Sequence, residues 1–245
     1  MIERTVEVPT RDGATTTFIV HPDRDGPHPV ILFFMDAPAI REELRDMARR
    51  LATAGYYVML PNLYYRAGVL ELVPPGGAMD EALRARMMEL MDGLTIAMVM
   101  EDSDALLAYA EGDGAADAAR VGCVGYCMSG QFSINAAARH ASRVKAAASI
   151  HGTFLVTDKD DSPHLAARKA GGELYFGCAE IDRWAPAETV EALAASLKAD
   201  GIKAEVEVYP GVQHGFVFPE RAAYDKAAAE QHWARLNALF RRNLG

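Results

Sequence analysis

The stretch from Val121 to Gly130 constrains the fold of this chain more than any other. It reads Val-Gly-Cys-Val-Gly-Tyr-Cys-Met-Ser-Gly, a short apolar run that ends in a Gly-x-Cys-x-Ser-Gly turn before an alanine-rich segment. A sharp turn from a strand into a helix needs small neighbours, and Gly125 and Ser129 meet that need. Such a turn raises the side chain of Cys127 above the strand end and aims backbone N–H groups at it, which favours a thiolate. Cys127 is therefore a candidate nucleophile, the alternative being a buried structural thiol.

The rest of the chain predicts an α/β fold with a mostly parallel central sheet and helices on both faces. Strand patterns alternate with helical patterns along most of the sequence. Strands are expected at residues 5–9, 15–21, 29–34, 56–60, 120–124, 144–150, 173–177 and 204–209. Helices are expected at residues 41–54, 79–91, 95–111, 131–140, 186–199 and 221–243. Binding residues in such a sheet gather at the carboxyl ends of the strands.

The sequence indicates a single domain over residues 1–245, because no internal repeat or low-complexity linker interrupts it. Residues 62–93 depart from the alternation, with a Pro-Pro-Gly-Gly motif at 74–77 and a methionine-rich helical pattern after it. We expect this segment to form an excursion over the mouth of the active site.

Composition excludes several classes of partner. The net charge is −9 and no basic run is present, which argues against nucleic acid as a partner. No apolar run approaches the roughly 20 residues that a membrane span needs, and the first residues lack a signal-peptide core. The 3 cysteines argue against a disulfide framework. We expect a cytoplasmic protein, a monomer or small homo-oligomer, that uses no cofactor and no metal.

A thiol nucleophile needs a base, and a histidine can supply it near neutral pH. His214 follows the last predicted strand in a glycine-bounded loop, where this architecture keeps its base, although a solvated loop histidine is the alternative. The acid that orients the base should lie between nucleophile and base in the chain. Asp182 and Glu180 both satisfy this order; Asp182, four residues before Pro186, is favoured by its spacing to the proline, and either could instead be a helix-start charge.

Acyl transfer also needs backbone donors for the developing oxyanion. The N–H of Met128, directly after the nucleophile, is the first candidate, and the N–H of Ala37 is the second because Pro38 has none. Asp36 lies in the same loop. It could cap the following helix, or it could hold the thiol proton at rest and release it when substrate arrives.

Four further residues are candidates for substrate contacts: Tyr126, His151, Trp184 and Phe216. For His151, which ends the strand at 144–150, an ordinary hydrogen-bonded histidine is an equal alternative. Cys123, inside its strand, and Cys178 are expected to be buried structural thiols.

With these residues in place, the chain resembles the dienelactone hydrolase family of α/β-hydrolases over nearly its full length. Four motifs carry the resemblance: Gly125-Tyr126-Cys127-Met128-Ser129-Gly130, Asp182-Arg183-Trp184-Ala185-Pro186, His214-Gly215-Phe216 and Pro61-Asn62-Leu63-Tyr64-Tyr65-Arg66. The resemblance implies a Cys-His-Asp triad that cleaves a small ester or lactone through an acyl-enzyme. It assigns Cys127 as nucleophile, His214 as base, Asp182 as orienting acid, and Met128 and Ala37 as oxyanion donors.

Three positions depart from the family pattern. Asp36 stands where the best-studied type has glutamate, and Asn62 stands where aspartate is common. No arginine follows His214 closely, Arg221 being the first, so a substrate more apolar than the dienelactone remains open.

Three other functions remain as alternatives. One is a general carboxylesterase or thioesterase without lactone preference. Another is a non-catalytic binding protein that retains the fold. The last is a thiol redox protein using Cys123 and Cys127, whose C-x₃-C spacing differs from the C-x-x-C of thioredoxins.

Overall fold

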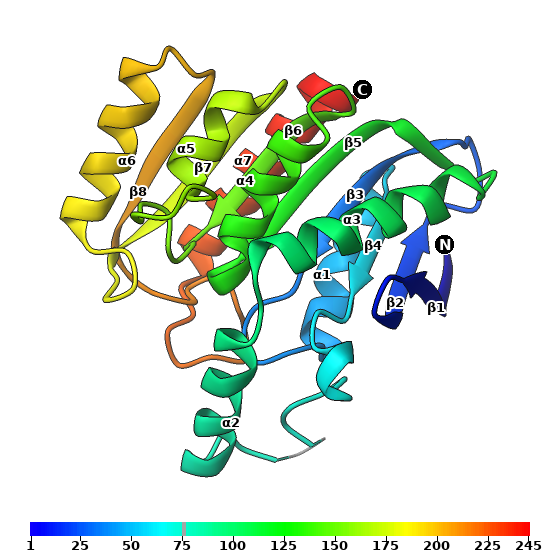
Figure 1. Cartoon of the computed structure of the whole chain (residues 1–245), viewed down its shortest axis with the longest axis horizontal. Helices are drawn as coiled ribbons and strands as arrows, with labels where there is room; N and C mark the ends of the chain where they lie inside the picture. Colours follow the sequence, from blue (N-terminus) through cyan, green and yellow to red (C-terminus); the bar gives the residue numbers. More distant parts are fainter. Residues whose placement is uncertain (75–76) are drawn as a thin grey trace. The chain divides into compact units, whose positions relative to one another are not determined.

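The computed structural model describes residues 1–74 and 77–245 of the chain (Figure 1). It divides into two compact units, Met1–Ala118 and Ala119–Gly245. Pro75 and Gly76, in the middle of the predicted excursion at 62–93, lie outside the described residues. The prediction of a single domain, and that of an excursion over the active site, stay predictions.

The first unit is built on a mixed sheet with strand order β1-β2-β4-β3. Strands β1 (Ile2–Thr10) and β2 (Gly13–His21) form an antiparallel hairpin that closes at the Thr10–Gly13 pair. Strand β4 (Tyr57–Pro61) pairs antiparallel with β2 and parallel with β3 (His28–Phe34). Strands β3 and β4 are continuous apolar runs and are almost entirely buried, as expected for strands covered on both faces.

Two helices cover the strands of this unit. Helix α1 (Glu42–Thr53) packs on β2 and β4 through the apolar stripe that the sequence predicts, Leu44, Met47, Ala48 and Leu51. Helix α3 (Ile96–Glu111) contacts β1, and the Thr95 side chain caps its first turn by accepting the Met98 N–H at 3.2 Å. The segment 62–93 contains a short helix η1 (Tyr65–Ala67) and helix α2 (Glu81–Asp92).

The second unit has four parallel strands in the order β5-β6-β7-β8. They are β5 (Ala116–Tyr126), which begins just before the unit boundary, β6 (Val144–Ile150), β7 (Glu173–Ile181) and β8 (Ala204–Gln213). Helix α4 (Gly130–Arg139) lies in front of these strands in Figure 1 and helix α7 (Lys226–Leu244), in red, lies behind them. Both contact β6, and α6 (Ala187–Ala199) contacts β8. The prediction of an α/β fold is confirmed.

The structure differs from the sequence prediction mainly at element ends. Strands β7 and β8 run on to Ile181 and Gln213, four residues beyond the predicted ends at 177 and 209. Helix α7 begins at Lys226 instead of 221, because the Asp225 side chain accepts the Ala228 N–H at 2.9 Å and caps the helix there. The short helices η2 (Cys127–Ser129), α5 (Pro163–Ala166) and η3 (Ala167–Lys169) have too few residues for an apolar period to show.

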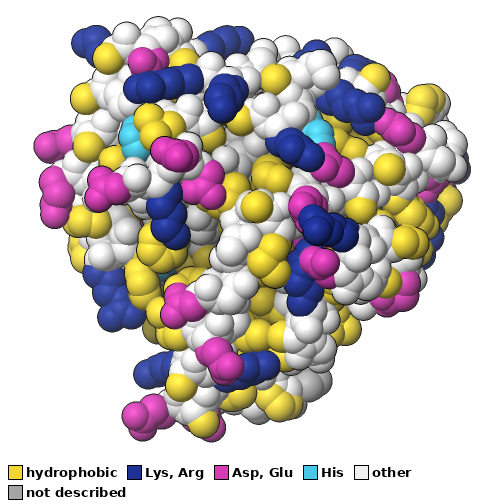
Figure 2. Space-filling model, viewed as in Figure 1, with side chains coloured by type: hydrophobic (Ala, Val, Ile, Leu, Met, Phe, Trp, Pro, Cys, Tyr) yellow, Lys and Arg dark blue, Asp and Glu magenta, His cyan; other side chains and the backbone are white. Residues whose placement is uncertain are grey.

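The surface carries charges of both signs. On the face that Figure 2 shows, Lys and Arg side chains lie among Asp and Glu side chains instead of forming one basic area. Across the described residues, no helix combines the length and the apolar character that crossing a membrane requires.

Candidate active site

Cys127 lies at the turn between β5 and α4, in a backbone conformation that only close packing can hold. Its φ is 55°, in the left-handed region that costs a non-glycine residue of order 1–3 kcal/mol. A Cβ on Gly125 would overlap the carbonyl oxygen of Ser129. A Cβ on Gly130 would overlap Ser149 Oγ and the Cα of Gly152. The two glycines therefore allow the strand and the helix to approach at the angle that presents the cysteine.

The loop after β6 fixes the other side of this turn. The Thr153 N–H donates a hydrogen bond of 3.1 Å to the carbonyl oxygen of Cys127. The Cys127 side chain is mostly covered, with 8% of the residue exposed. The turn is thus held from both sides before any substrate binds.

His214 and Asp182 come together at the carboxyl ends of neighbouring strands. Asp182 follows β7 directly and His214 follows β8 directly, and the last paired residues of these strands are Ile181 and Gln213. His214 Nδ1 lies 2.7 Å from Asp182 Oδ2. The other carboxylate oxygen, Oδ1, accepts the Trp184 N–H at 2.9 Å. Asp182 is therefore held by two bonds that orient it toward the histidine.

Glu180, the alternative acid, has a different partner. Its Oε2 accepts the N–H of Gly211 at 2.7 Å, and the side chain is exposed. Between the two carboxylates that the sequence left open, the geometry places Asp182 on the histidine.

The pKa of His214 depends on both Asp182 and Cys127. Burial lowers the pKa of His214, but the hydrogen bond to Asp182 and the interaction with Cys127 outweigh burial and raise the pKa to about 9. Its second ring nitrogen, Nε2, is buried and has no hydrogen bond of ordinary geometry to any described residue. A histidine with this pKa holds its proton at neutral pH.

The other two thiols differ from Cys127. Burial raises the pKa of Cys123, which is fully enclosed in β5. Burial and then the charge of Asp182 raise the pKa of Cys178 to about 12. All three cysteines are free thiols. Cys123 and Cys178 therefore stay protonated in the core, and a redox function through Cys123 has no support in the structure.

The predicted substrate residues occupy unequal positions. The His151 ring lies beside His214, with ring centroids 4.7 Å apart. Tyr126 and Phe216 are fully buried, and the Tyr126 hydroxyl lies 3.1 Å from His232 Nε2. Trp184 is partly exposed and stacks under the Arg183 guanidinium, 5.0 Å from the ring centroid. Packing accounts for Tyr126 and Phe216, and their predicted contact with substrate stays a prediction.

Asp36 and Ala37 lie in the first unit, so their part in catalysis stays a prediction from the sequence. Asp36 is fully buried, and its Oδ1 lies 2.6 Å from Arg41 Nη1. Arg41 also binds Glu43, with Nη2 2.6 Å from Oε2. The N-cap position of α1 is occupied by Arg41, whose side chain makes no capping hydrogen bond. Nothing in the spacing of the sequence marked Arg41 as the partner of Asp36.

The backbone at the second predicted oxyanion donor is tightly turned. The Ala37 carbonyl oxygen accepts the Tyr64 hydroxyl at 2.9 Å, and the Ala39 N–H donates to the Asp36 carbonyl oxygen at 3.2 Å. Ala39 itself has a φ of 71°. These contacts fix the peptide of Ala37 without using its N–H, which donates no hydrogen bond among the described loops and turns.

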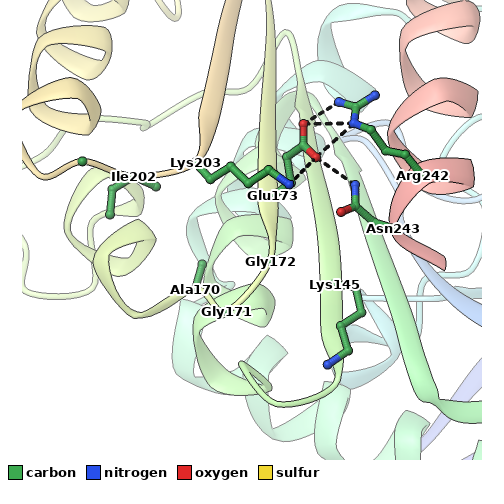
Figure 3. A pocket seen from close by; sticks show the side chains of 10 residues that line it. Lys145, Ala170, Gly171, Gly172, Glu173, Ile202, Lys203, Arg242 and Asn243 are labelled. Atoms are coloured by element: carbon green, nitrogen blue, oxygen red, sulfur yellow. Dashed lines mark hydrogen bonds and ion pairs between the residues drawn. The ribbon is translucent and has the colours of Figure 1, made fainter.

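A separate cavity in the second unit lies at the opposite end of the strands (Figure 3). Its volume is about 420 Å³, and Glu173 at the start of β7 reaches three side chains on its wall. The Glu173 carboxylate accepts hydrogen bonds from Arg242 at 3.0 Å and from Asn243 at 2.9 Å, and lies 3.1 Å from Lys203 Nζ. These contacts tie the end of α7 to the sheet, so we assign the cluster a structural role.

No group of three or more histidine, cysteine, aspartate or glutamate side chains in residues 1–74 and 77–245 is arranged to hold a metal ion.

The fold and the strained cysteine turn at a strand end define an enzyme of the α/β-hydrolase class. Within this class the chain belongs to the dienelactone hydrolase family, whose family model matches residues 15–244. The resemblance seen in the sequence is thereby confirmed. Membership makes the chain a hydrolase of ester or lactone bonds that acts on a small molecule.

Relatives agree with this assignment. A protein of Methylorubrum extorquens named "Putative carboxymethylenebutenolidase" is 31% identical, over 98% of this chain and 81% of its own length. A crystal structure titled as a "Putative Dienelactone Hydrolase" from Klebsiella pneumoniae has a TM-score of 0.87 and 28% identity, and covers 98% of both chains. A dienelactone hydrolase-like phosphotriesterase from metagenomic libraries, at 20% identity and a TM-score of 0.79, shares the fold.

Proposed function

We propose that the protein is a cysteine-dependent hydrolase of small esters or lactones that works through Cys127, His214 and Asp182. One observation supports this most: the 2.7 Å contact of His214 with Asp182 in a histidine whose raised pKa also reflects Cys127. Nucleophile, base and orienting acid thereby act on one another in the order that acyl transfer requires.

The proposed reaction has two halves. The Cys127 thiolate attacks the carbonyl carbon, and the carbonyl oxygen takes the negative charge. His214 then gives its proton to the departing alkoxide, which leaves as an alcohol from an ester or stays tethered from a lactone. The result is a thioester on Cys127. In the second half, His214 takes a proton from water, the hydroxide attacks the thioester, and the carboxylic acid leaves as the thiolate is restored.

The oxyanion donors follow from the turn. The N–H of Met128 is at the start of the short helix η2, directly after Cys127, and we assign it as the first donor. Ala37 is the second donor on sequence grounds. Loss of one such donor typically costs about 10²–10³ in rate.

The role of Asp36 in thiol activation is also part of the proposal, in a modified form. Asp36 already has a basic partner, because its Oδ1 accepts a charge-assisted hydrogen bond of 2.6 Å from Arg41 Nη1, so we do not assign the thiol proton to it. We infer that the Asp182–His214 pair suffices to ionise Cys127. Under this view Asp36→Asn changes the pH dependence of thiol alkylation little.

Two experiments test the proposal. Iodoacetamide should label Cys127 and abolish hydrolysis of a simple aryl ester, and Cys127→Ala should remove the same activity. Cys123→Ala serves as the matched control, since Cys123 is enclosed in β5 and takes no part in the reaction. Full activity in Cys127→Ala would show that another group attacks the substrate.

The substrate class separates lactone hydrolysis from general ester or thioester hydrolysis. A comparison of kcat/KM for neutral esters and lactones with that for analogues that carry a free carboxylate tests whether Arg221, whose charge reaches His151, binds the substrate. His151 and Trp184 remain our candidates for contact with the bound molecule. Equal rates on lactones, aryl esters and thioesters would favour a general esterase. A folded protein inert to all of them, with a normal thiol, would favour a binding protein.

A further inference from the structure

His151 is a buried polar residue that takes part in no bond-making or bond-breaking step of the proposed mechanism. Only 1% of the residue is exposed, and neither Nδ1 nor Nε2 has a hydrogen-bond partner among the described residues. Leaving such a group unpaired in the interior costs about 1–3 kcal/mol. His232 of the same unit shows the usual arrangement, because it is equally buried but its ring nitrogens lie 3.1 Å from Tyr126 Oη and 3.0 Å from the Ala229 carbonyl oxygen.

The backbone holds this ring in place despite strain. His151 has a φ of 37°, in the region that disfavours side chains larger than glycine. Its N–H donates to the Gly177 carbonyl oxygen at 2.6 Å, and two residues later Thr153 is bonded to the Cys127 carbonyl oxygen at 3.1 Å. Gly152 between them has no room for a Cβ beside Ser149 Oγ. The loop is thus fixed both to β7 and to the nucleophile turn.

The ring of His151 packs edge-on against the catalytic base. The planes of His151 and His214 are 64° apart, with 4.7 Å between the centroids. Three aromatic rings surround His151 on its other sides, with centroids at 5.9 Å for Phe216, 5.5 Å for Phe218 and 6.1 Å for Tyr126. The His151 ring is thus held in place by its neighbours, and it leaves His214 little freedom to rotate away from Asp182.

The unpaired ring nitrogens of His151 explain why its imidazole stays uncharged. A histidine cation has two N–H donors, and neither would find an acceptor at this position. Burial lowers the pKa of His151, and the charges of His214, Arg221 and His232 lower it further. His214, by contrast, has Asp182 and Cys127 to favour its cation. One of the two neighbouring imidazoles can therefore carry the proton while the other remains neutral.

We propose that His151 is a positioning residue: its neutral ring holds the His214 imidazole against Asp182 and toward Cys127 by edge-to-face packing. This inference rests on the proposed function, since it concerns the base of the same triad. His151 neither attacks nor transfers a proton, and it acts through His214. A small residue at this position would leave a cavity next to His214 and let its ring turn.

A pair of variants separates packing from hydrogen bonding. In His151→Ala, with the ring lost, we expect kcat to fall about 10- to 100-fold while KM changes little. In His151→Phe, which keeps an aromatic ring without nitrogens, we expect most of kcat to return. Equal losses in the two variants would overturn the packing role and assign the function to a ring nitrogen. No loss in either would leave His151 without a role.

A second readout needs no substrate. The rate of Cys127 alkylation by iodoacetamide against pH reports the thiolate. His151→Ala should shift the midpoint of this profile, because the charged His214 ring is no longer held in place, and His151→Phe should leave it unchanged. Since alkylation is independent of hydrolysis, failure of the ester assays alone would count against the proposed function and not against this inference.

A third measurement uses the unaltered protein, in case His151→Ala does not fold. ¹⁵N chemical shifts of the histidine rings should show His151 as neutral at pH 7, with His214 losing its proton near pH 9. A protonated His151 ring at pH 7 would overturn the inference.

Discussion

Asp182 and His214 are 32 residues apart in the chain and meet through a bond of 2.7 Å. At the scale of single residues, the proposed role of His214 as the base depends on this hydrogen bond, because the bond sets both the orientation and the charge of the imidazole. The carboxylate in turn is held by the Trp184 N–H at 2.9 Å. The catalytic power of Cys127 should therefore depend on a residue that never touches the substrate.

Replacement of Asp182 by asparagine tests this dependence. Asp182→Asn removes the hydrogen-bonded carboxylate that raises the pKa of His214, so the pKa should fall from about 9, while the interaction with Cys127 still raises it against burial. We expect kcat to fall about 10³–10⁴-fold, because an amide no longer favours the useful tautomer. Steady-state rates and the pH profile of Cys127 alkylation measure both effects.

Glu180→Gln is the matched control for this variant. Glu180 lies two positions away and accepts the Gly211 N–H at 2.7 Å, so its loss should change the rate by less than about threefold. If Glu180→Gln were as damaging as Asp182→Asn, the assignment of the acid would be wrong.

At the scale of elements, the turn from β5 into α4 is the part most sensitive to volume. A methyl group on Gly125 would meet the Ser129 carbonyl oxygen, which is backbone and cannot yield without opening the turn. Gly125→Ala should therefore destabilise the protein by about 1–3 kcal/mol and abolish ester hydrolysis. Denaturant unfolding and a rate assay measure the two losses.

Gly114→Ala provides the comparison, because nothing lies within 4 Å of the position that a Cβ would take there. That variant should keep full activity and nearly full stability. An active and stable Gly125→Ala would contradict the close approach of strand and helix.

Sequence patterns predicted most elements of the fold. The physical reason is that a buried strand needs a continuous apolar run and a packed helix needs an apolar stripe, and both patterns can be recognised in the sequence. The strand at 144–150 has the bounds of β6, and the stripe of α1 is the buried one. Cys127, Asp182 and His214 could be proposed from the sequence because each follows a strand at the sheet edge where parallel strands end. The family itself was recognised from the motifs that surround them.

The sequence did not predict which side chains contact each other. Between Asp36 and Arg41, which are in contact, the chain turns at Ala39 with a φ of 71°. No residue type in this loop predicts such a turn. His151 was left open between a substrate contact and an ordinary core histidine. His151 and His214 lie in the loops after β6 and β8, with ring centroids 4.7 Å apart. A local sequence pattern cannot predict a contact between two separate loops.

At the scale of the whole molecule, stability in acid should depend on carboxylates bound by basic groups. Bonds from Arg242 outweigh burial, with help from Asn243 and Lys203, and lower the pKa of Glu173 to about 2. A carboxylate with a lowered pKa stabilises the folded state above its unfolded pKa of roughly 4.3, and this contribution is lost as pH falls through the folded value.

Glu173→Gln should therefore reduce the free energy of unfolding at pH 7 and flatten its decline between about pH 4.5 and 2. Urea unfolding at several pH values measures this change. Glu191→Gln, on the exposed side of α6, is the control and should leave the profile unaltered. An unchanged profile in Glu173→Gln would mean that the tie between α7 and β7 contributes nothing.

Intact-mass spectrometry of the acid-quenched enzyme during turnover of an aryl ester detects the proposed thioester on Cys127. We expect a species heavier by one acyl group, mapped to the peptide that holds Cys127, and accumulated further in Asp182→Asn if deacylation slows most. Hydrolysis that proceeds with no acyl adduct on Cys127, or with full rate in Cys127→Ala, would contradict it.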